Sequence, residues 1–345
     1  MPISTKECQE ITTLLRHPSF DTVQKGCELA ENFCAYPEDY IELLNFLKYF
    51  DPSPSIWQKI QGLFSSKSIP KSPDSVTLSW LQEGITGMDH AGYIQLWAWG
   101  HLAKWDHNLQ SMTDLHFEKK GLLQLPASIQ SLTSLESLGL DDNQLTQLPD
   151  FIADFKNLNL ISLINNQLEE IPDWIGALPN LQDLYLCSNQ ITHLPSTLKN
   201  IQKLDTLDIG DNHFAIFPAV IQFLPCLQTL SMYENAITEL PDWIGTLTQL
   251  VELDLNENDI TALPESIGHL KALRELDLSK NKLQSLPSTL GQLTKLTEFH
   301  LNDNQLTTLP STLKNLQNVD SCYLFDNPLD EDWLEQEFPN LNAFI

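Results

Sequence analysis

The sequence predicts an α/β fold: a horseshoe-shaped solenoid whose parallel strands form one concave sheet, preceded by a small all-α N-terminal segment. Asparagine recurs every 23 residues from Asn143 to Asn327, and proline keeps the same period from Pro126 to Pro310. Apolar residues stand five and three positions before each of these asparagines, and again two positions after it. A strict period of about 20 to 50 residues indicates stacked structural repeats, each of which contacts its neighbours.

Each repeat is expected to contain one short strand. Alternating apolar residues, such as Leu138 and Leu140, give this strand one buried face. The next strand comes one repeat later and must run parallel to it, joined by a right-handed crossover. The Leu-Pro pair that follows makes an extended corner, because proline fixes φ and cannot continue a ladder. As the chain returns, Ile152, Phe155 and Leu158 are expected to bury their side chains inside the coil.

The motif LxLxxNxLxxLP at residues 138–149 resembles that of the leucine-rich repeat family, in the 23-residue LPxxIGxL form seen in bacterial and Ras-group proteins. The resemblance covers roughly residues 112–330. It implies an asparagine ladder, in which each side chain satisfies inward-facing backbone groups and links neighbouring coils. This role is carried onto Asn143, Asn166, Asn189, Asn212, Asn235, Asn258, Asn281, Asn304 and Asn327.

The two ends of the array need caps, because a terminal coil would expose its apolar edge. At the N-terminal end, Lys120 stands where an asparagine is due, which indicates a degenerate first coil. At the C-terminal end, a short helix is expected to carry Trp333, Leu334, Phe338, Leu341 and Phe344. The predicted segments are a helical N-terminal segment at 1–64, a linker at 65–75, a helical N-terminal cap at 76–113, the repeat array at 114–330 and a C-terminal cap at 331–345.

The N-terminal segment is predicted to be helical. Helices are expected at about residues 4–17, 20–36, 37–50 and 56–64, and again around 93–104. Residues 76–110 are rich in tryptophan and are expected to pack on the first coil as a cap; a cofactor or nucleotide pocket lined by these tryptophans is the alternative. They are Trp80, Trp97, Trp99 and Trp105. One face of the second helix is expected to carry Phe20, Val23, Cys27, Ala30 and Cys34.

Composition excludes several classes of partner. The chain has 46 Asp and Glu against 19 Lys and Arg, a formal charge of −27, with 42% apolar residues. Such a chain repels double-stranded nucleic acid and anionic membrane surfaces and attracts a basic protein surface. The acid is concentrated in residues 121–345, where 31 acidic and 9 basic residues give −22, while residues 1–120, with 15 and 10, carry −5.

The common catalytic motifs are missing, so the chain is predicted not to be an enzyme and to use no cofactor or metal. His90, His101 and His107 lack the spacing of metal ligands on one helix face. Residues 254–258 match the start of a calcium loop, but Asp259 stands where that loop needs glycine. Repeat register assigns this segment to the scaffold instead.

The six cysteines have no paired spacing, so they are expected to be reduced thiols in a cytoplasmic protein. Cys187 is expected at an exposed strand position, where no neighbouring base would activate it. No segment has the features of a secretory signal or a membrane span. A bacterial source would also allow delivery into a host cell.

Outward residues are expected six, four, two and one positions before each asparagine. An apolar and aromatic patch comes first along these columns, and carboxylates dominate the later repeats. Aromatic residues can anchor a partner and carboxylates can steer a basic one, although acids also keep an exposed sheet soluble. The predicted function is therefore protein–protein recognition, with a basic partner on the acidic concave face. The predicted binding residues are Ile164, Tyr185, Asp208, Asp211, Tyr233, Glu252, Asp254, Glu275, Asp277 and Glu298.

Two other functions stay open. In the first, the helical N-terminal segment carries the activity and the repeats select the substrate, as in an effector or a ligase adaptor. A truncation comprising residues 1–110, tested for a bound cofactor or partner, would distinguish it. In the second, the array is a structural element that associates with itself through its flanks or caps, which light scattering would detect.

Overall fold

The structure is a computed structural model of the 345-residue chain. It describes residues 10–11, 13–15, 17, 19–33, 97, 100–101, 103, 110–338 and 343–344. The chain forms two compact units. The first comprises Met1–Leu135 with Asp142–Phe155, and the second comprises Glu136–Asp141 with Lys156–Ile345.

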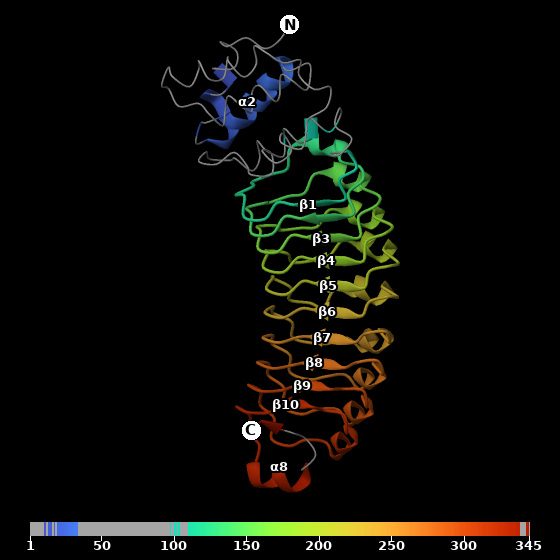
Figure 1. The fold of residues 1–345 in the computed structure, drawn as a ribbon. Coiled ribbons are helices and arrows are strands. Elements are labelled where there is room, and N and C mark those ends of the chain that lie inside the picture. The colour runs from blue at the N-terminus through green and yellow to red at the C-terminus, as the bar shows by residue number, and fades with distance from the viewer. Residues whose placement is uncertain are drawn as a thin grey trace. The chain divides into compact units, whose positions relative to one another are not determined.

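The second unit contains ten parallel strands, β2 to β11, each hydrogen-bonded to the next in chain order. Figure 1 shows the strands of this unit stacked side by side in chain order. From β2 to β10, each residue pairs with the residue one repeat later, as Leu138 does with Ile161, so the predicted period sets the register. The strands are β2 Ser137–Gly139, β3 Leu160–Ser162, β4 Asp183–Tyr185, β5 Thr206–Asp208, β6 Thr229–Ser231, β7 Glu252–Asp254, β8 Glu275–Asp277, β9 Glu298–His300, β10 Ser321–Tyr323 and β11 Ala343–Phe344.

Each coil returns through a short 3₁₀ helix. Every one of these helices starts directly after a proline of the 23-residue series, whose φ of −63° to −76° suits an extended residue at the corner. The helices are η1 Ala127–Ser131 and η2 Asp150–Asp154 in the first unit, and η3 Asp173–Ala177, η4 Ser196–Asn200, η5 Ala219–Phe223, η6 Asp242–Thr246, η7 Glu265–His269, η8 Ser288–Gln292 and η9 Ser311–Asn315 in the second.

The core lies inside the coils, between the strands and the 3₁₀ helices. The middle residue of each three-residue strand and the third residue of each 3₁₀ helix are buried, as Leu253 and Ile267 illustrate. Ile152, Phe155 and Leu158 are also buried, as predicted. Each such side chain contributes about 1.5–3 kcal/mol through removal from water.

The predicted asparagine ladder is confirmed. Asn212 Nδ2 donates to the Leu186 carbonyl in the preceding coil at 3.0 Å, and Asn212 Oδ1 accepts from the Ile191 amide at 2.9 Å. All nine predicted asparagines donate to the carbonyl 26 residues earlier. These side chains therefore replace the strand hydrogen bonds where each coil leaves the sheet.

The residue before each ladder position has a left-handed backbone. In the ten coils φ at this position lies between 47° and 57°. Asp and Asn tolerate this conformation better than most residues because their side chains bond locally. Asp211, a predicted binding residue, stands at one of these positions with φ 47°. Its backbone geometry is thus a structural reason for an aspartate there.

The first unit contains α2, Phe20–Phe33, and β1, Asp114–His116. Helix α2 begins at the predicted residue and buries Val23, Cys27 and Ala30. Described residues at 10–11 and 13–15, and at 97 and 100–101, are helical as expected. The predicted helices at 37–50 and 56–64 and the linker at 65–75 lie outside the described residues.

Side chains of the first unit join α2, the Trp97 segment and η1. Glu31 Oε1 accepts from Trp97 Nε1 at 2.9 Å and lies 3.0 Å from His101 Nε2. The Trp97 carbonyl accepts from Ser128 Oγ at 2.8 Å, and the Gly100 carbonyl accepts from Ser131 Oγ at 2.5 Å. Residues far apart in sequence thus meet on the first 3₁₀ helix.

The C-terminal end differs from the prediction in one respect. Helix α8, Glu331–Glu337, starts with Asp330 accepting from the Trp333 amide, and it buries Leu334. Phe344 was expected in this helix, but it belongs to β11, which pairs with β10. The unpaired edge of β10 accounts for this, because a parallel strand satisfies backbone groups that a longer helix would leave open.

Candidate functional site

Strand geometry determines which side chains face solvent. From β4 to β10, the middle residue is buried while the first and third are exposed or half-buried. Successive side chains of a strand point to opposite sides, so these outward residues share one surface. We call it the strand face; it also includes the residue two places before each ladder asparagine. It is the side that the sequence predicts to be concave.

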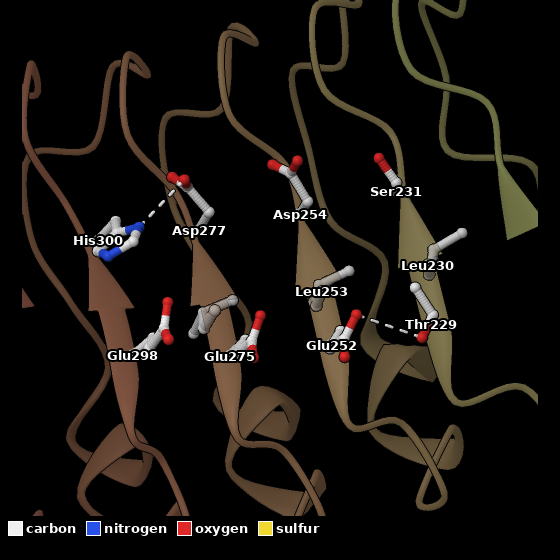
Figure 2. Close-up of a pocket in the computed structure, with 11 residues that line it drawn as sticks. Thr229, Leu230, Ser231, Glu252, Leu253, Asp254, Glu275, Asp277, Glu298 and His300 are labelled. Atoms are coloured by element: carbon white, nitrogen blue, oxygen red, sulfur yellow. Dashed lines mark hydrogen bonds and ion pairs between the residues drawn. The ribbon is translucent and has the colours of Figure 1, made fainter. Parts of the chain in front are cut away.

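A pocket of about 260 Å³ lies on the strand face across β6 to β9. Figure 2 shows its two rows of side chains, with Glu252, Glu275 and Glu298 in one row and Asp254 and Asp277 in the other. We call this pocket the acidic hollow. No lysine or arginine is among the described residues that line it. Its full lining is Thr229, Leu230, Ser231, Glu252, Leu253, Asp254, Glu275, Leu276, Asp277, Glu298 and His300.

In-register pairing brings the like charges together. Glu252 pairs with Glu275, which pairs with Glu298, and Asp254 pairs with Asp277. Neighbouring strands are about 4.8 Å apart, so each carboxylate has another beside it. Like charges at such positions destabilise a sheet by some tenths of a kcal/mol. The fold alone gains nothing from this arrangement.

Two carboxyl groups in the acidic hollow are harder to ionise than usual. Burial raises the pKa of Asp254 to about 6, and the charges of Asp277 and Asp208 act in the same direction. Burial also raises the pKa of Glu275, and the charges of Glu252 and Glu298 add to this effect. A cation placed in the hollow would relieve both penalties.

Asp277 behaves differently because it has more hydrogen-bond partners than Asp254, which accepts from the Asn256 amide at 3.0 Å. His300 Nδ1 lies 3.3 Å from Asp277 Oδ2, and the side chain and amide of Ser279 both donate to Asp277 Oδ1. Burial acts to raise the pKa of Asp277, but these hydrogen bonds outweigh it and lower the pKa. The same bond to Asp277 raises the pKa of His300. Asp277 and His300 are therefore an ion pair at mildly acidic pH.

The sequence prediction missed His300. It stands four positions before Asn304, in an outward column, so the period marked its place. What the period could not show is its contact with Asp277 and its ring contact with Tyr323, whose centroid lies 4.5 Å away. His300 thus ends the acidic hollow and begins an aromatic region.

A second group of side chains surrounds Tyr233. The ring lies against Gly210, where an added Cβ would overlap it. Burial and a hydrogen bond with Cys187 raise the pKa of the Tyr233 hydroxyl, and burial and the Asp208 charge raise the pKa of Cys187 to about 12. Cys187 was expected to be exposed, but it is buried and hydrogen-bonded to Tyr233, and its thiol stays protonated.

The remaining predicted residues lie on earlier coils, and all of them except Asp211 belong to the strand face. Tyr185 and Asp208 are the third residues of β4 and β5 and pair directly. Ile164 is half-buried and stands two places before Asn166. Five of the ten predicted residues therefore share the acidic hollow, and five lie along earlier coils.

The described residues contain no group of three or more His, Cys, Asp or Glu arranged to hold a metal ion. In the segment that resembles a calcium loop, Asn258 belongs to the ladder and Asn256 donates to Ser279 Oγ at 2.8 Å. Among the described helices, none has the length and apolar character needed to cross a membrane.

Comparison with known families agrees with this architecture. Residues 133–191, 156–214 and 179–237 each match the family profile described as leucine rich repeat. Residues 252–332 match the profile described as leucine-rich repeat region, and together the matches cover more than half of the chain. The chain belongs to the leucine-rich repeat family. The narrower LPxxIGxL type and a bacterial origin stay predictions.

Solved leucine-rich repeat structures share this fold. The plant peptide hormone receptor RGFR1, solved in complex with RGF2, is 28% identical over 69% of this chain and 40% of that chain, with a TM-score of 0.59. The octameric complex of Latrophilin 3, Unc5D and FLRT2 matches at 22% identity over 69% of this chain and 77% of that chain, with a TM-score of 0.57. InlJ from Listeria monocytogenes is 23% identical over 68% and 53% of the two chains, with a TM-score of 0.52. No curated protein matches the sequence.

Proposed function

We propose that this leucine-rich repeat protein is a protein-recognition module, and that a basic segment of its partner binds in the acidic hollow. The observation that carries the proposal is the set of five carboxylates that line one pocket with a single imidazole beside them. Ion pairing would offset the repulsion that in-register pairing creates. The receptor RGFR1, with the same fold, is solved in complex with RGF2, which supports a binding role.

The side chains around the hollow have different proposed roles in binding. Asp254 and Glu275 have raised pKa values and gain most from a cation, because a positive charge restores their ionised forms. Asp277 is already bonded to His300 and Ser279, so it holds the hollow in shape. Tyr185 and Tyr233 on earlier coils are the proposed aromatic anchors for the rest of the partner.

The test is a charge-neutralising variant with Glu252→Gln, Asp254→Asn, Glu275→Gln and Glu298→Gln, in the full chain. Asp277 stays intact because its loss would free His300. The probe is a fluorescein-labelled peptide of alternating arginine and serine, followed by fluorescence anisotropy. Each ion pair between the peptide and a half-buried carboxylate contributes up to about 1 kcal/mol to binding. The variant is therefore expected to bind the peptide about tenfold or more weaker than the wild type, with a smaller dependence on salt.

A matched control removes the same four charges elsewhere: Glu169→Gln, Glu170→Gln, Glu239→Gln and Asp320→Asn. These residues are exposed and do not line the hollow. The control is expected to bind within about twofold of the wild type, because its carboxylates lie too far away for direct pairing. Equal weakening in both variants would show that net charge alone attracts the peptide, and the proposal would be wrong.

Two related predictions accompany this proposal. A cytoplasmic location and the absence of catalysis both follow from sequence, and they stay predictions. So does the alternative in which the N-terminal segment carries the activity, since most of residues 1–110 lie outside the described part of the chain.

A further inference from the structure

The row of outward residues that contains Asp254 and Asp277 continues past the acidic hollow. The register places Asp277 beside His300 and His300 beside Tyr323. The Tyr323 ring also meets the Phe325 ring in a T-shaped contact, with centroids 6.1 Å apart. Phe325 is 38% exposed, which is high for a large apolar side chain. An aromatic shelf, defined as Tyr323 and Phe325, thus borders the hollow on the strand face.

His300 lies between the acidic hollow and the aromatic shelf and contacts both. Its imidazole is bonded to Asp277 on one side and contacts the Tyr323 ring on the other. Asp277 is thereby partnered within the chain. In this row Asp254 is the carboxylate that His300 does not bond, and it stands on the β7 side of the hollow.

The separation between Asp254 and the aromatic shelf sets a length. Asp254 ends β7 and Tyr323 ends β10, three strand spacings apart. At about 4.8 Å per spacing this is about 14 Å. An extended polypeptide advances about 3.3 Å per residue, so side chains four residues apart are about 13 Å apart and point the same way. Side chains two residues apart, about 7 Å, would not reach from Asp254 to Tyr323.

We propose that the strand face binds an extended segment that crosses β7 to β10, with a lysine or arginine at Asp254 in the acidic hollow and an aromatic side chain four residues away on the aromatic shelf. This inference rests on the proposed function and specifies the partner. Charge complementarity selects the basic residue, and the exposed Phe325 supplies apolar and ring contacts to the aromatic one. The spacing between the two, rather than either residue alone, distinguishes this partner from basic segments in general.

The test uses capped, fluorescein-labelled serine-glycine peptides and the full chain. One peptide pair carries arginine and phenylalanine four residues apart, in either order; others carry them two residues apart, or replace phenylalanine by alanine. One order of the four-residue spacing is expected to bind about fivefold tighter than the two-residue and alanine peptides. Equal binding of all arginine peptides would overturn the inference.

Phe325→Ser is the variant that assigns the contact. It should abolish the preference for the phenylalanine peptide while arginine-dependent binding persists. Phe223→Ser is the matched control, because Phe223 is 55% exposed but lies at the end of η5, away from the strand face. A preference that survives in Phe325→Ser would also overturn the inference, and the comparison among peptides decides the matter even if that variant folds poorly.

The two proposals fail in different ways. If the four-carboxylate variant of the acidic hollow binds arginine peptides as well as its charge-matched control does, the proposed function itself is wrong. If the hollow carboxylates matter but spacing and Phe325 do not, the basic partner stands and the aromatic contact is wrong. The same set of titrations gives both answers.

Discussion

Replacing Asn212 by alanine tests the asparagine ladder at the centre of the array. Asn212 is buried, and its Nδ2 donates to the carbonyls of Leu186, Ile209 and Gly210 at 3.0, 3.3 and 2.9 Å. Its Oδ1 accepts from the Ile191 amide at 2.9 Å. Alanine removes all four hydrogen bonds and leaves a small void where the amide group was.

The expected loss of stability depends on which hydrogen bonds each backbone group keeps after the substitution. The Leu186 carbonyl still accepts from Asn189 Nδ2, and the Gly210 carbonyl still accepts from the Ser188 amide. The Ile209 carbonyl likewise keeps Asn235 Nδ2. The buried Ile191 amide loses Asn212, at about 1–3 kcal/mol for an unsatisfied donor. Adding a modest net loss for the other bonds gives a decrease of about 2–4 kcal/mol in the free energy of unfolding.

Urea denaturation, followed by far-ultraviolet circular dichroism and by tryptophan fluorescence, measures this loss. Both probes are needed, because a weakened coil can let the two halves of a repeat array unfold separately. The control is Asn200→Ala, an exposed residue at the end of η4, expected to cost less than about 0.5 kcal/mol. A loss below about 1 kcal/mol for Asn212→Ala would refute the ladder argument.

Two further changes test the strand face. Because burial raises the pKa of Asp254 to about 6, its charged form opposes folding, and this penalty grows as pH rises from about 4 through 6. Asp254→Asn should therefore be more stable than the wild type at pH 7, with the gain fading toward pH 4; a constant difference in urea midpoint would contradict this. Gly210→Ala should displace the Tyr233 ring and cost about 1–3 kcal/mol by overpacking. That cost should largely disappear in a Tyr233→Ser background, and an unchanged cost would show that the ring is not responsible.

Much of the fold was predictable because the same pattern of apolar and asparagine positions recurs in every repeat. The 23-residue period located the strands, and the apolar residues at fixed offsets identified the buried side. The ladder role of Asn143 and its eight successors was confirmed, since a residue with both donor and acceptor at the strand exit has a single structural use there. The same period is sufficient to place Glu252, Asp254, Glu275 and Asp277 on one face, where they line the acidic hollow.

Other features depended on neighbours that the period does not specify. Cys187 was expected to be exposed, but it is buried and hydrogen-bonded to Tyr233 from two coils later. The Tyr233 ring lies against Gly210 in the coil between, which has no side chain to hold the ring away. Phe344 was expected in the cap helix, but it belongs to β11, which pairs with the open edge of β10. His300 was missed because a lone histidine in an outward column gives no sign of its partners.

The sequence by itself determined the coil, its register and the side on which each residue lies, because every repeat imposes the same alternation and the same hydrogen-bond requirement. Tertiary structure decided how side chains from different repeats share the surface: that His300 pairs with Asp277 and not with Asp254, and that His300 connects carboxylates to aromatic rings. Those outcomes depend on distances of a few ångströms between side chains on adjacent strands, where charge, hydrogen bonding and burial act together.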